Sequence, residues 1–189
     1  GLECSQYHRA IARVLGDFLP ALFTLFLDDP KAHDPGLRAD LSWLHPRLGG
    51  AQTLAAYGVR SPADRPVAAV WADAVAAVPQ AHRDFLAGLP LMHRRGEVLF
   101  VHAGIRPGLP LDVQIETDLV WIRDAFLNDR RDHGVLVVHG HTVVDRPMHY
   151  GNRVNLDTGA AYGGPLTVAV IEGRAVFLLT DGGRVPLTP

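Results

Sequence analysis

Two short apolar runs, each followed by a histidine and a glycine, constrain this chain more than any other feature. Residues 135–138 are four consecutive apolar residues, a pattern typical of a strand buried on both faces. His139-Gly140-His141-Thr142 follows directly, and glycine between two imidazoles lets the backbone turn sharply. Residues 97–101 have the pattern of a second strand, and they lead into His102-Ala103-Gly104. If the two strands are neighbours, one ring from each can meet at the same sheet edge.

His102 and His141 are therefore predicted to bind a metal ion. Neutral imidazole is the commonest protein ligand for transition metals, and a matched pair at two strand ends favours that use. The alternative is that each histidine only caps its strand through a bond to the backbone. His139 is interpreted as a neighbour of the site and not as a ligand. A third short strand, residues 153–156, brings Asp157 to the same region.

Composition and charge exclude several classes of function. At 189 residues the chain is expected to form one domain, residues 1–189, with a sizeable core. The net charge is −2 and there is no long basic run, which argues against a nucleic-acid partner. The single cysteine, Cys4, cannot form an internal disulfide and fits a reducing compartment. The apolar run at residues 18–27 is too short to span a membrane, so a cytoplasmic protein with no membrane partner is expected.

Periodicity and turn signals predict an α+β fold, with a helical first half and mostly β-structure in the second half. A hairpin is expected where Glu172-Gly173-Arg174 separates two apolar runs. The three tryptophans, Trp43, Trp71 and Trp121, are interpreted as core residues. Helices are predicted at residues 7–15, 18–27, 40–44, 51–57, 67–78, 79–89 and 118–127, and strands at 97–101, 135–138, 153–156, 166–171 and 175–180.

Four motifs occur in one order along the second half of the chain. They are FVHAGIRPG at residues 100–108, LVWIR at 119–123, VHGHT at 138–142 and NLDTG at 155–159. Each is weak alone, but together they resemble the C-terminal part of the calcineurin-like metallophosphoesterase superfamily, in its bacterial serine/threonine phosphoprotein-phosphatase branch. The similarity extends upstream through LDDP at residues 27–30 and WLHPRLGGAQTLAAYGV at 43–59, and it covers about residues 20 to 180.

This resemblance implies a four-layer αββα sandwich, in which the second half of this chain forms a mixed β-sheet. It also implies a pair of divalent metals that activate water for attack on phosphorus. Manganese is the metal expected first, with iron and zinc as alternatives. The substrate would be a phosphorylated protein or a small phosphoester. Arg123 matches a phosphate-binding arginine; the alternative is a surface ion pair with Asp124 or Asp118. Asp157 resembles a residue near the site, although an aspartate that shapes the turn before Thr158-Gly159 explains it equally well.

The chain also departs from the pattern of this superfamily. It lacks G-D-x-H-G, G-D-x-x-D-R-G and G-N-H-E, the motifs that supply most metal ligands and the histidine that protonates the leaving group. No residue is therefore assigned as the proton donor, and one metal or none is expected. Gly16-Asp17-Phe18-Leu19 stands where G-N-H-E should fall, which makes Asp17 a candidate third ligand.

In the superfamily that the chain resembles, the absent motifs normally lie on strands of the first sheet, so this chain would lack strands that cover one sheet face. The uncovered apolar face would favour self-association or poor stability, unless residues 1–15 and 67–78 repack over it. Three functions remain open on the sequence. The chain could be a metal-dependent phosphoesterase, a remnant that binds metal or phosphate without efficient turnover, or a fragment whose other ligands lie upstream of Gly1.

Overall fold

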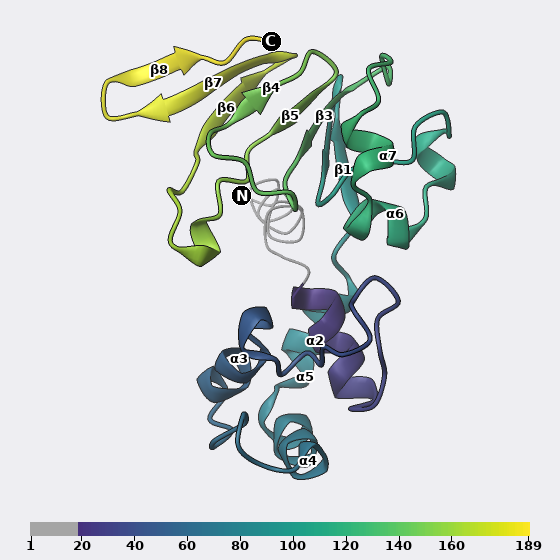
Figure 1. Ribbon diagram of the computed structural model, residues 1–189, viewed down its shortest axis with the longest axis vertical. Coiled ribbons are helices and arrows are strands. Elements are labelled where there is room, and N and C mark those ends of the chain that lie inside the picture. Colours follow the sequence, from purple (N-terminus) through teal and green to yellow (C-terminus); the bar gives the residue numbers. More distant parts are fainter. Residues whose placement is uncertain (1–18) are drawn as a thin grey trace. The chain divides into compact units, whose positions relative to one another are not determined.

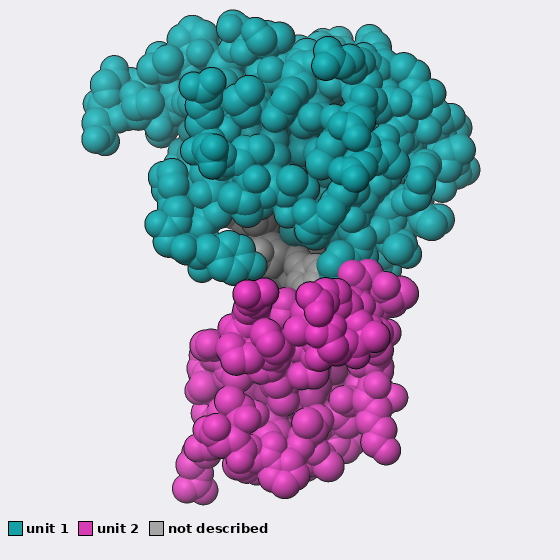
Figure 2. All heavy atoms as spheres, in the orientation of Figure 1, with its two compact units in different colours: residues 1–17, 90–189 teal, residues 18–89 magenta. Residues whose placement is uncertain are grey.

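The computed structural model describes residues 19–189, which fall into two compact units that meet in sequence at Leu89 and Pro90 (Figures 1 and 2). We call residues 19–89 the helical unit and residues 90–189 the sheet unit. Together they contain helices, one mixed sheet and one antiparallel sheet, so the predicted α+β class is confirmed. No helix in the described residues is long and apolar enough to cross a membrane.

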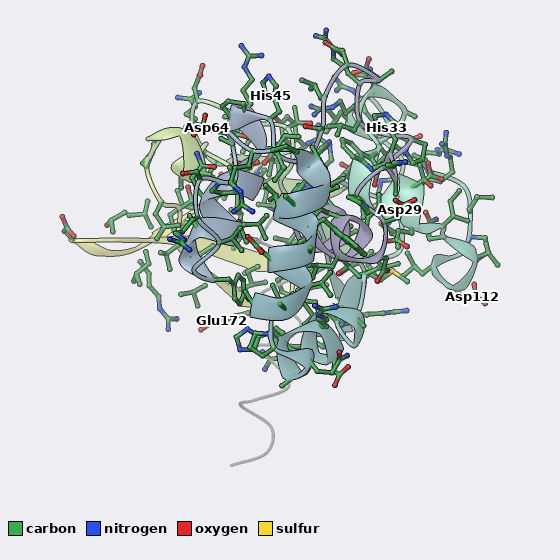
Figure 3. All side chains as sticks on the ribbon, turned by 90° about the horizontal axis from the view of Figure 1, so that it is seen from below. Asp29, His33, His45, Asp64, Asp112 and Glu172 are labelled. Carbon is green, nitrogen blue, oxygen red and sulfur yellow. The ribbon has the colours of Figure 1, made fainter. Side chains whose placement is uncertain are left out.

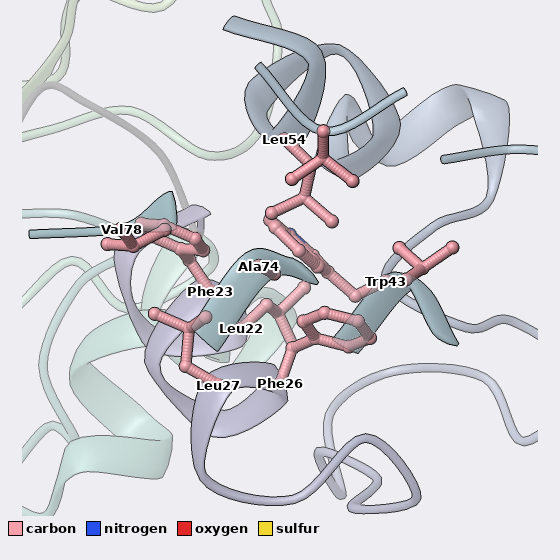
Figure 4. Packing of buried hydrophobic residues seen from close by; sticks show 10 residues of the cluster. Leu22, Phe23, Phe26, Leu27, Trp43, Leu54, Ala74 and Val78 are labelled. Atoms are coloured by element: carbon pink, nitrogen blue, oxygen red, sulfur yellow. The ribbon is translucent and has the colours of Figure 1, made fainter. Parts of the chain in front are cut away.

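The helical unit is built from short helices around one apolar cluster (Figure 4). Phe23 and Phe26 lie on one face of the first described helix, and their rings lie 5.3 Å and 5.0 Å from that of Trp43. Gly50 permits close packing here, because a Cβ at this position would lie 2.7 Å from Trp43 Cδ2. The elements are α2 (Leu19–Asp28), η1 (Pro46–Leu48), α3 (Gly50–Ala56), α4 (Val67–Ala77) and α5 (Gln80–Ala87).

The apolar face of α4 is buried inside the helical unit. Val70 and Ala74 are fully buried in the same cluster as the α2 side chains. Residues 67–78 therefore bury this face against helices and not against a sheet. The other segment predicted to cover a sheet face, residues 1–15, lies outside the described residues, as does the predicted helix at residues 7–15.

The helix predicted at residues 40–44 is wrong. That segment consists of turns, followed by the 3-10 helix η1. His45 precedes Pro46 and adopts an extended conformation with ψ 138°, because proline disfavours helical geometry in the residue before it. Local side-chain bonds shape the preceding loop: the Lys31 N–H donates to Asp29 Oδ1 at 2.8 Å, and His33 Nε2 bonds the Leu37 carbonyl at 2.9 Å (Figure 3).

The sheet unit contains a five-stranded sheet in the order β1-β2-β3-β5-β4. Its central strands β2, β3 and β5 are parallel, and the outer strands β1 and β4 are antiparallel to their neighbours. A second, antiparallel sheet has the order β6-β7-β8. The strands are β1 (Met92–Arg95), β2 (Val98–Val101), β3 (Leu136–His139), β4 (Met148–His149), β5 (Arg153–Asn155), β6 (Ala169–Glu172), β7 (Ala175–Thr180) and β8 (Gly183–Pro186).

The two faces of the five-stranded sheet pack against different partners. On one face, Leu99, Val101 and Val137 cluster with apolar side chains of the segment between β2 and β3, including Phe126. On the other face, Leu136, Val138 and Val154 cluster with Val176 of β7. Side chains alternate between faces along each strand, so neighbouring residues at a strand end are aimed at opposite sides.

The single helix predicted at residues 118–127 is two short helices, α6 (Glu116–Trp121) and α7 (Asp124–Leu127). In a continuous helix the Leu119 carbonyl would accept a hydrogen bond from the Arg123 N–H. Instead it accepts one from the Ala103 N–H at 2.9 Å, in the segment that follows β2. This contact ends α6 and leaves Arg123 in a non-helical conformation between the two helices. The 3-10 helices η2 (Leu111–Val113) and η3 (Ala160–Tyr162) complete the unit.

Candidate metal centre

The two predicted histidines lie at the ends of adjacent parallel strands. Phe100 of β2 pairs with Val138 of β3, so the carboxyl ends of these strands meet at one sheet edge. His102 follows β2 directly, and His141 lies two residues beyond the end of β3. The Gly140 N–H donates to the His102 carbonyl at 2.9 Å. This bond links the backbone segments that carry the two rings.

A tight turn aims His141 at His102. The Gly140 carbonyl accepts a hydrogen bond from the Thr142 N–H at 2.7 Å, and His141, between them, has a φ of 65°. Such a conformation costs a non-glycine residue roughly 1–3 kcal/mol, and here it brings the rings together. His102 Nε2 lies 3.0 Å from His141 Nδ1. The predicted meeting of the two rings is confirmed, and their role as metal ligands stays a prediction.

The two ring nitrogens that face each other could occupy two coordination positions of one divalent cation. Two nitrogens bound to the same tetrahedral zinc at roughly 2.0–2.1 Å would be about 3.4 Å apart, which is close to the observed 3.0 Å. The other ring nitrogen of His141, Nε2, does not face His102 and is buried without a hydrogen-bond partner in the described residues. Residues 19–189 hold no group of three or more His, Cys, Asp or Glu side chains placed to bind a metal. Asp17, the candidate third ligand, lies outside these residues.

The site keeps both rings neutral at physiological pH. Burial lowers the pKa of His102 to about 4, although nearby Asp157 opposes this shift. Burial, followed by the charges of His102, Arg123 and His139, lowers the pKa of His141 to about 3. A metal-binding imidazole must be unprotonated, so both rings are in the form that a cation requires.

The depressed pKa of His102 predicts a loss of stability in mild acid. The folded-state pKa of about 4 lies below the ordinary value of 6.5, so the unfolded state binds more protons between these values. The contribution of the neutral His102 ring to the free energy of unfolding is present above pH 6.5 and is lost as the pH falls toward 4. For His102 alone we expect the free energy of unfolding to drop by about 2 kcal/mol between pH 7 and pH 5. Urea unfolding of the parent and of His102→Gln at both pH values measures this, and an equal drop in both proteins would contradict it.

Arg123 lies beside the histidine pair. Its Nη1 donates to Thr142 Oγ1 at 3.3 Å, and the side chain remains exposed. Its positive charge contributes to the lowered pKa of both His102 and His141. Asp118, one of the two predicted surface partners, instead forms an ion pair with Arg106. The guanidinium is therefore placed where it can meet an anion bound near the two rings.

Asp157 has the turn-forming role that was one of its two interpretations. Its Oδ1 accepts a hydrogen bond from the Gly159 N–H at 3.0 Å, which shapes the turn after β5. Its carboxylate also favours the protonated form of the His102 ring, so it lies close enough to interact electrostatically with the site. Its other interpretation, a bond that supports a metal-bound histidine, stays a prediction.

Small-molecule sites typically have volumes of about 300–1,000 Å³, and the cavity next to the histidines has a volume of 680 Å³. His102, His141 and Asp157 line its polar part. Its other walls are mostly apolar and include side chains from both sheets, namely Phe100, Val138, Leu156 and Ile171. An uncovered apolar sheet face was expected from the sequence; instead, Val138 and Val154 on this face are buried in a cluster with Val176 of β7, and the cavity lies beside them.

Two contacts of the site were missed in the sequence. Thr142 holds Arg123 through its hydroxyl group. Trp121, interpreted as a core residue, is only partly buried, and its ring lies edge-on to that of His141 at 5.8 Å and 90°. Nothing in the spacing between the LVWIR and VHGHT motifs indicates that residues of one motif contact residues of the other. Arg123 lies at the break between α6 and α7.

Comparisons with known proteins leave the family unassigned. No protein-family model matches the chain, and no curated protein matches it. Among solved structures, the chain is similar to one described as the crystal structure of a "putative diadenosine tetraphosphatase". The TM-score is 0.43 and the sequence identity 21%, over 75% of this chain and 70% of that one. This likeness is too distant to assign a function, so the site geometry has to support any proposal.

Proposed function

We propose that the sheet unit carries the site of a metal-dependent phosphoesterase that hydrolyses phosphate monoesters. The observation that supports this most is the His102–His141 pair, two neutral rings with nitrogens 3.0 Å apart, beside the guanidinium of Arg123. A cation site next to a guanidinium is suited to a phosphate group, because both stabilise negative charge on its oxygens.

Each of these residues has a distinct role in the proposal. His102 and His141 would hold one divalent cation, with manganese expected first and iron or zinc as alternatives. The bound cation would supply Lewis-acid stabilisation of the phosphoryl oxygens and activation of water. Arg123 would donate hydrogen bonds to two phosphate oxygens, since its planar fork matches their geometry. Thr142 would restrict the Arg123 side chain through the bond at 3.3 Å.

A second candidate is a remnant that binds metal or phosphate without efficient turnover. It is favoured by the sequence, which lacks the three motifs that carry the other ligands and the proton donor. It is also favoured by the ligand count, since the described residues provide two imidazoles and no third ligand near them. The substrate in either case would be a phosphorylated protein or a small phosphoester, and a cytoplasmic location and self-association remain proposals.

Manganese-dependent hydrolysis of p-nitrophenyl phosphate tests both candidates. We expect turnover roughly 100- to 10,000-fold below that of a phosphoesterase with a positioned acid, because general acid–base help is typically worth that much. Arg123→Met should lower kcat/KM by about tenfold or more, since a hydrogen bond to a charged group contributes roughly 1.5–3 kcal/mol.

Arg130→Met is the matched control, because Arg130 is an exposed arginine nearby in sequence that does not line the cavity. Equal kcat/KM values for the Arg123 and Arg130 variants would contradict the phosphate-binding role. Turnover at an ordinary enzymatic rate that His141→Ala abolishes would exclude the remnant. It would mean that ligands outside the described residues complete the site.

A further inference from the structure

Arg153 is a buried arginine without a carboxylate partner in the described residues. Its side chain is on the first residue of β5, and the residue is only 5% exposed. Nη2 donates to the Leu127 carbonyl at 2.8 Å, and the guanidinium carbon lies 3.7 Å from the centre of the Tyr150 ring. A buried guanidinium without an opposite charge is unfavourable, so the contact of its other terminal nitrogen, Nη1, needs a physical explanation.

That remaining contact is with His139. Arg153 Nη1 lies 3.2 Å from His139 Nε2, and His139 is fully buried at the end of β3. A guanidinium has only donors and stays protonated. His139 Nε2 must therefore accept the hydrogen bond, which places the ring hydrogen on Nδ1. In this tautomer Nδ1 donates to the Gly140 carbonyl, 3.2 Å away.

The Gly140 carbonyl is the hydrogen-bond acceptor of the tight turn that carries His141. It also accepts the hydrogen bond from the Thr142 N–H at 2.7 Å, across His141 with its φ of 65°. A strained conformation of this kind persists only when its surroundings hold it in place. His139 points away from the His102–His141 pair, toward Phe126 at 5.1 Å between ring centres. Its hydrogen bond to the Gly140 carbonyl couples it to the His141 turn through the backbone, in addition to its electrostatic effect on the pKa of His141.

We infer that Arg153 is a positioning residue for the proposed site: it fixes the Nδ1–H tautomer of His139, and that hydrogen holds the Gly140 carbonyl so that His141 faces His102. This inference rests on the proposed function only for the ligand role of His141. The hydrogen-bond chain from Arg153 through His139 to the turn is a property of the fold and can be measured without metal or substrate. His139 thus gains a role that differs from that of a ligand.

Long-range ¹H–¹⁵N correlation spectra of histidine-labelled protein, recorded without metal, test the first step. The parent should show His139 with its hydrogen on Nδ1. In Arg153→Met, which keeps an unbranched side chain but removes every donor, His139 should lose this single-tautomer pattern and the His141 ring signals should shift. Arg130→Met, at an exposed position, should change neither. An Nε2–H pattern for His139 in the parent would overturn the inference even if Arg153→Met failed to fold.

Manganese titration of the same proteins tests the second step. Substitution of a residue that orients a metal-binding histidine typically costs about 10–100-fold in metal affinity, and we expect a loss of that size in Arg153→Met. Arg153→Lys, which keeps one charged donor, should recover part of it. An unchanged affinity in Arg153→Met would overturn the positioning role. If His139 and His141 respond as expected but the parent binds no manganese, the hydrogen-bond chain is supported and the proposed function fails.

Discussion

Replacement of Phe126 by alanine is expected to destabilise the sheet unit by about 3–5 kcal/mol, the usual cost of removing a large buried aromatic side chain. Phe126 is fully buried in α7. Its ring packs against Gly104, where an added Cβ would lie 2.7 Å from Phe126 Cγ. It also meets the His139 ring edge-on, at 5.1 Å and 80°. The substitution would therefore leave a cavity that neither the loop after β2 nor β3 can fill easily.

Urea unfolding followed by circular dichroism measures this loss. Phe177→Ala is the matched control, because Phe177 of β7 belongs to the same unit but is only partly buried. Burial energy scales with the area removed from water, so the control should lose less stability. Equal losses for the two variants would contradict the central position of Phe126 in the packing between α7 and the sheet.

The strand-histidine-glycine pattern allowed the centre of the site to be predicted from sequence. Apolar runs of four residues each marked β2 and β3, and these strands are parallel neighbours whose carboxyl ends meet at one edge. His102 and His141 had to lie close once the strands were paired in this register. The α+β class followed in the same way, from helical periodicity before residue 97 and mostly strand patterns after it.

Features that depend on tertiary contacts could not be predicted. The break between α6 and α7 exists because the Leu119 carbonyl bonds the Ala103 N–H, a contact between residues that no local pattern connects. Strand β1 was missed because its sequence, MHRR, has no apolar alternation, and it forms by pairing with β2. The short strand β4 and the edge strand β8 were missed for the same reason.

Arg153 shows the same limit at the site itself. From the sequence, an arginine before Val154 gives no sign that it lies buried against His139. Only the register of β3 and β5, with Val137 opposite Arg153 and His139 opposite Asn155, places both side chains on one face of the sheet. The chemical consequence for the His139 tautomer then follows from donor and acceptor counting.

The largest functional effect is expected from removal of either histidine of the pair. Tight metal sites usually have three or four protein ligands, and the described residues supply two. Loss of one of them should weaken binding by more than about a hundredfold, beyond the roughly 10–100-fold that substitution of an orienting residue costs. His149→Ala is the matched control, because His149 of β4 lies in the same unit and does not line the cavity.

Calorimetric titration with manganese and with zinc, at a pH where the rings are neutral, tests the metal-binding pair most directly. We predict one ion per chain for the parent and for His149→Ala, and no measurable binding for His102→Ala or His141→Ala. Asp17→Ala belongs in the same series, since a loss of affinity there would support the predicted third ligand. Absence of binding in the parent, or parent-like affinity in His102→Ala and His141→Ala, would contradict the proposal that these two histidines form a metal site.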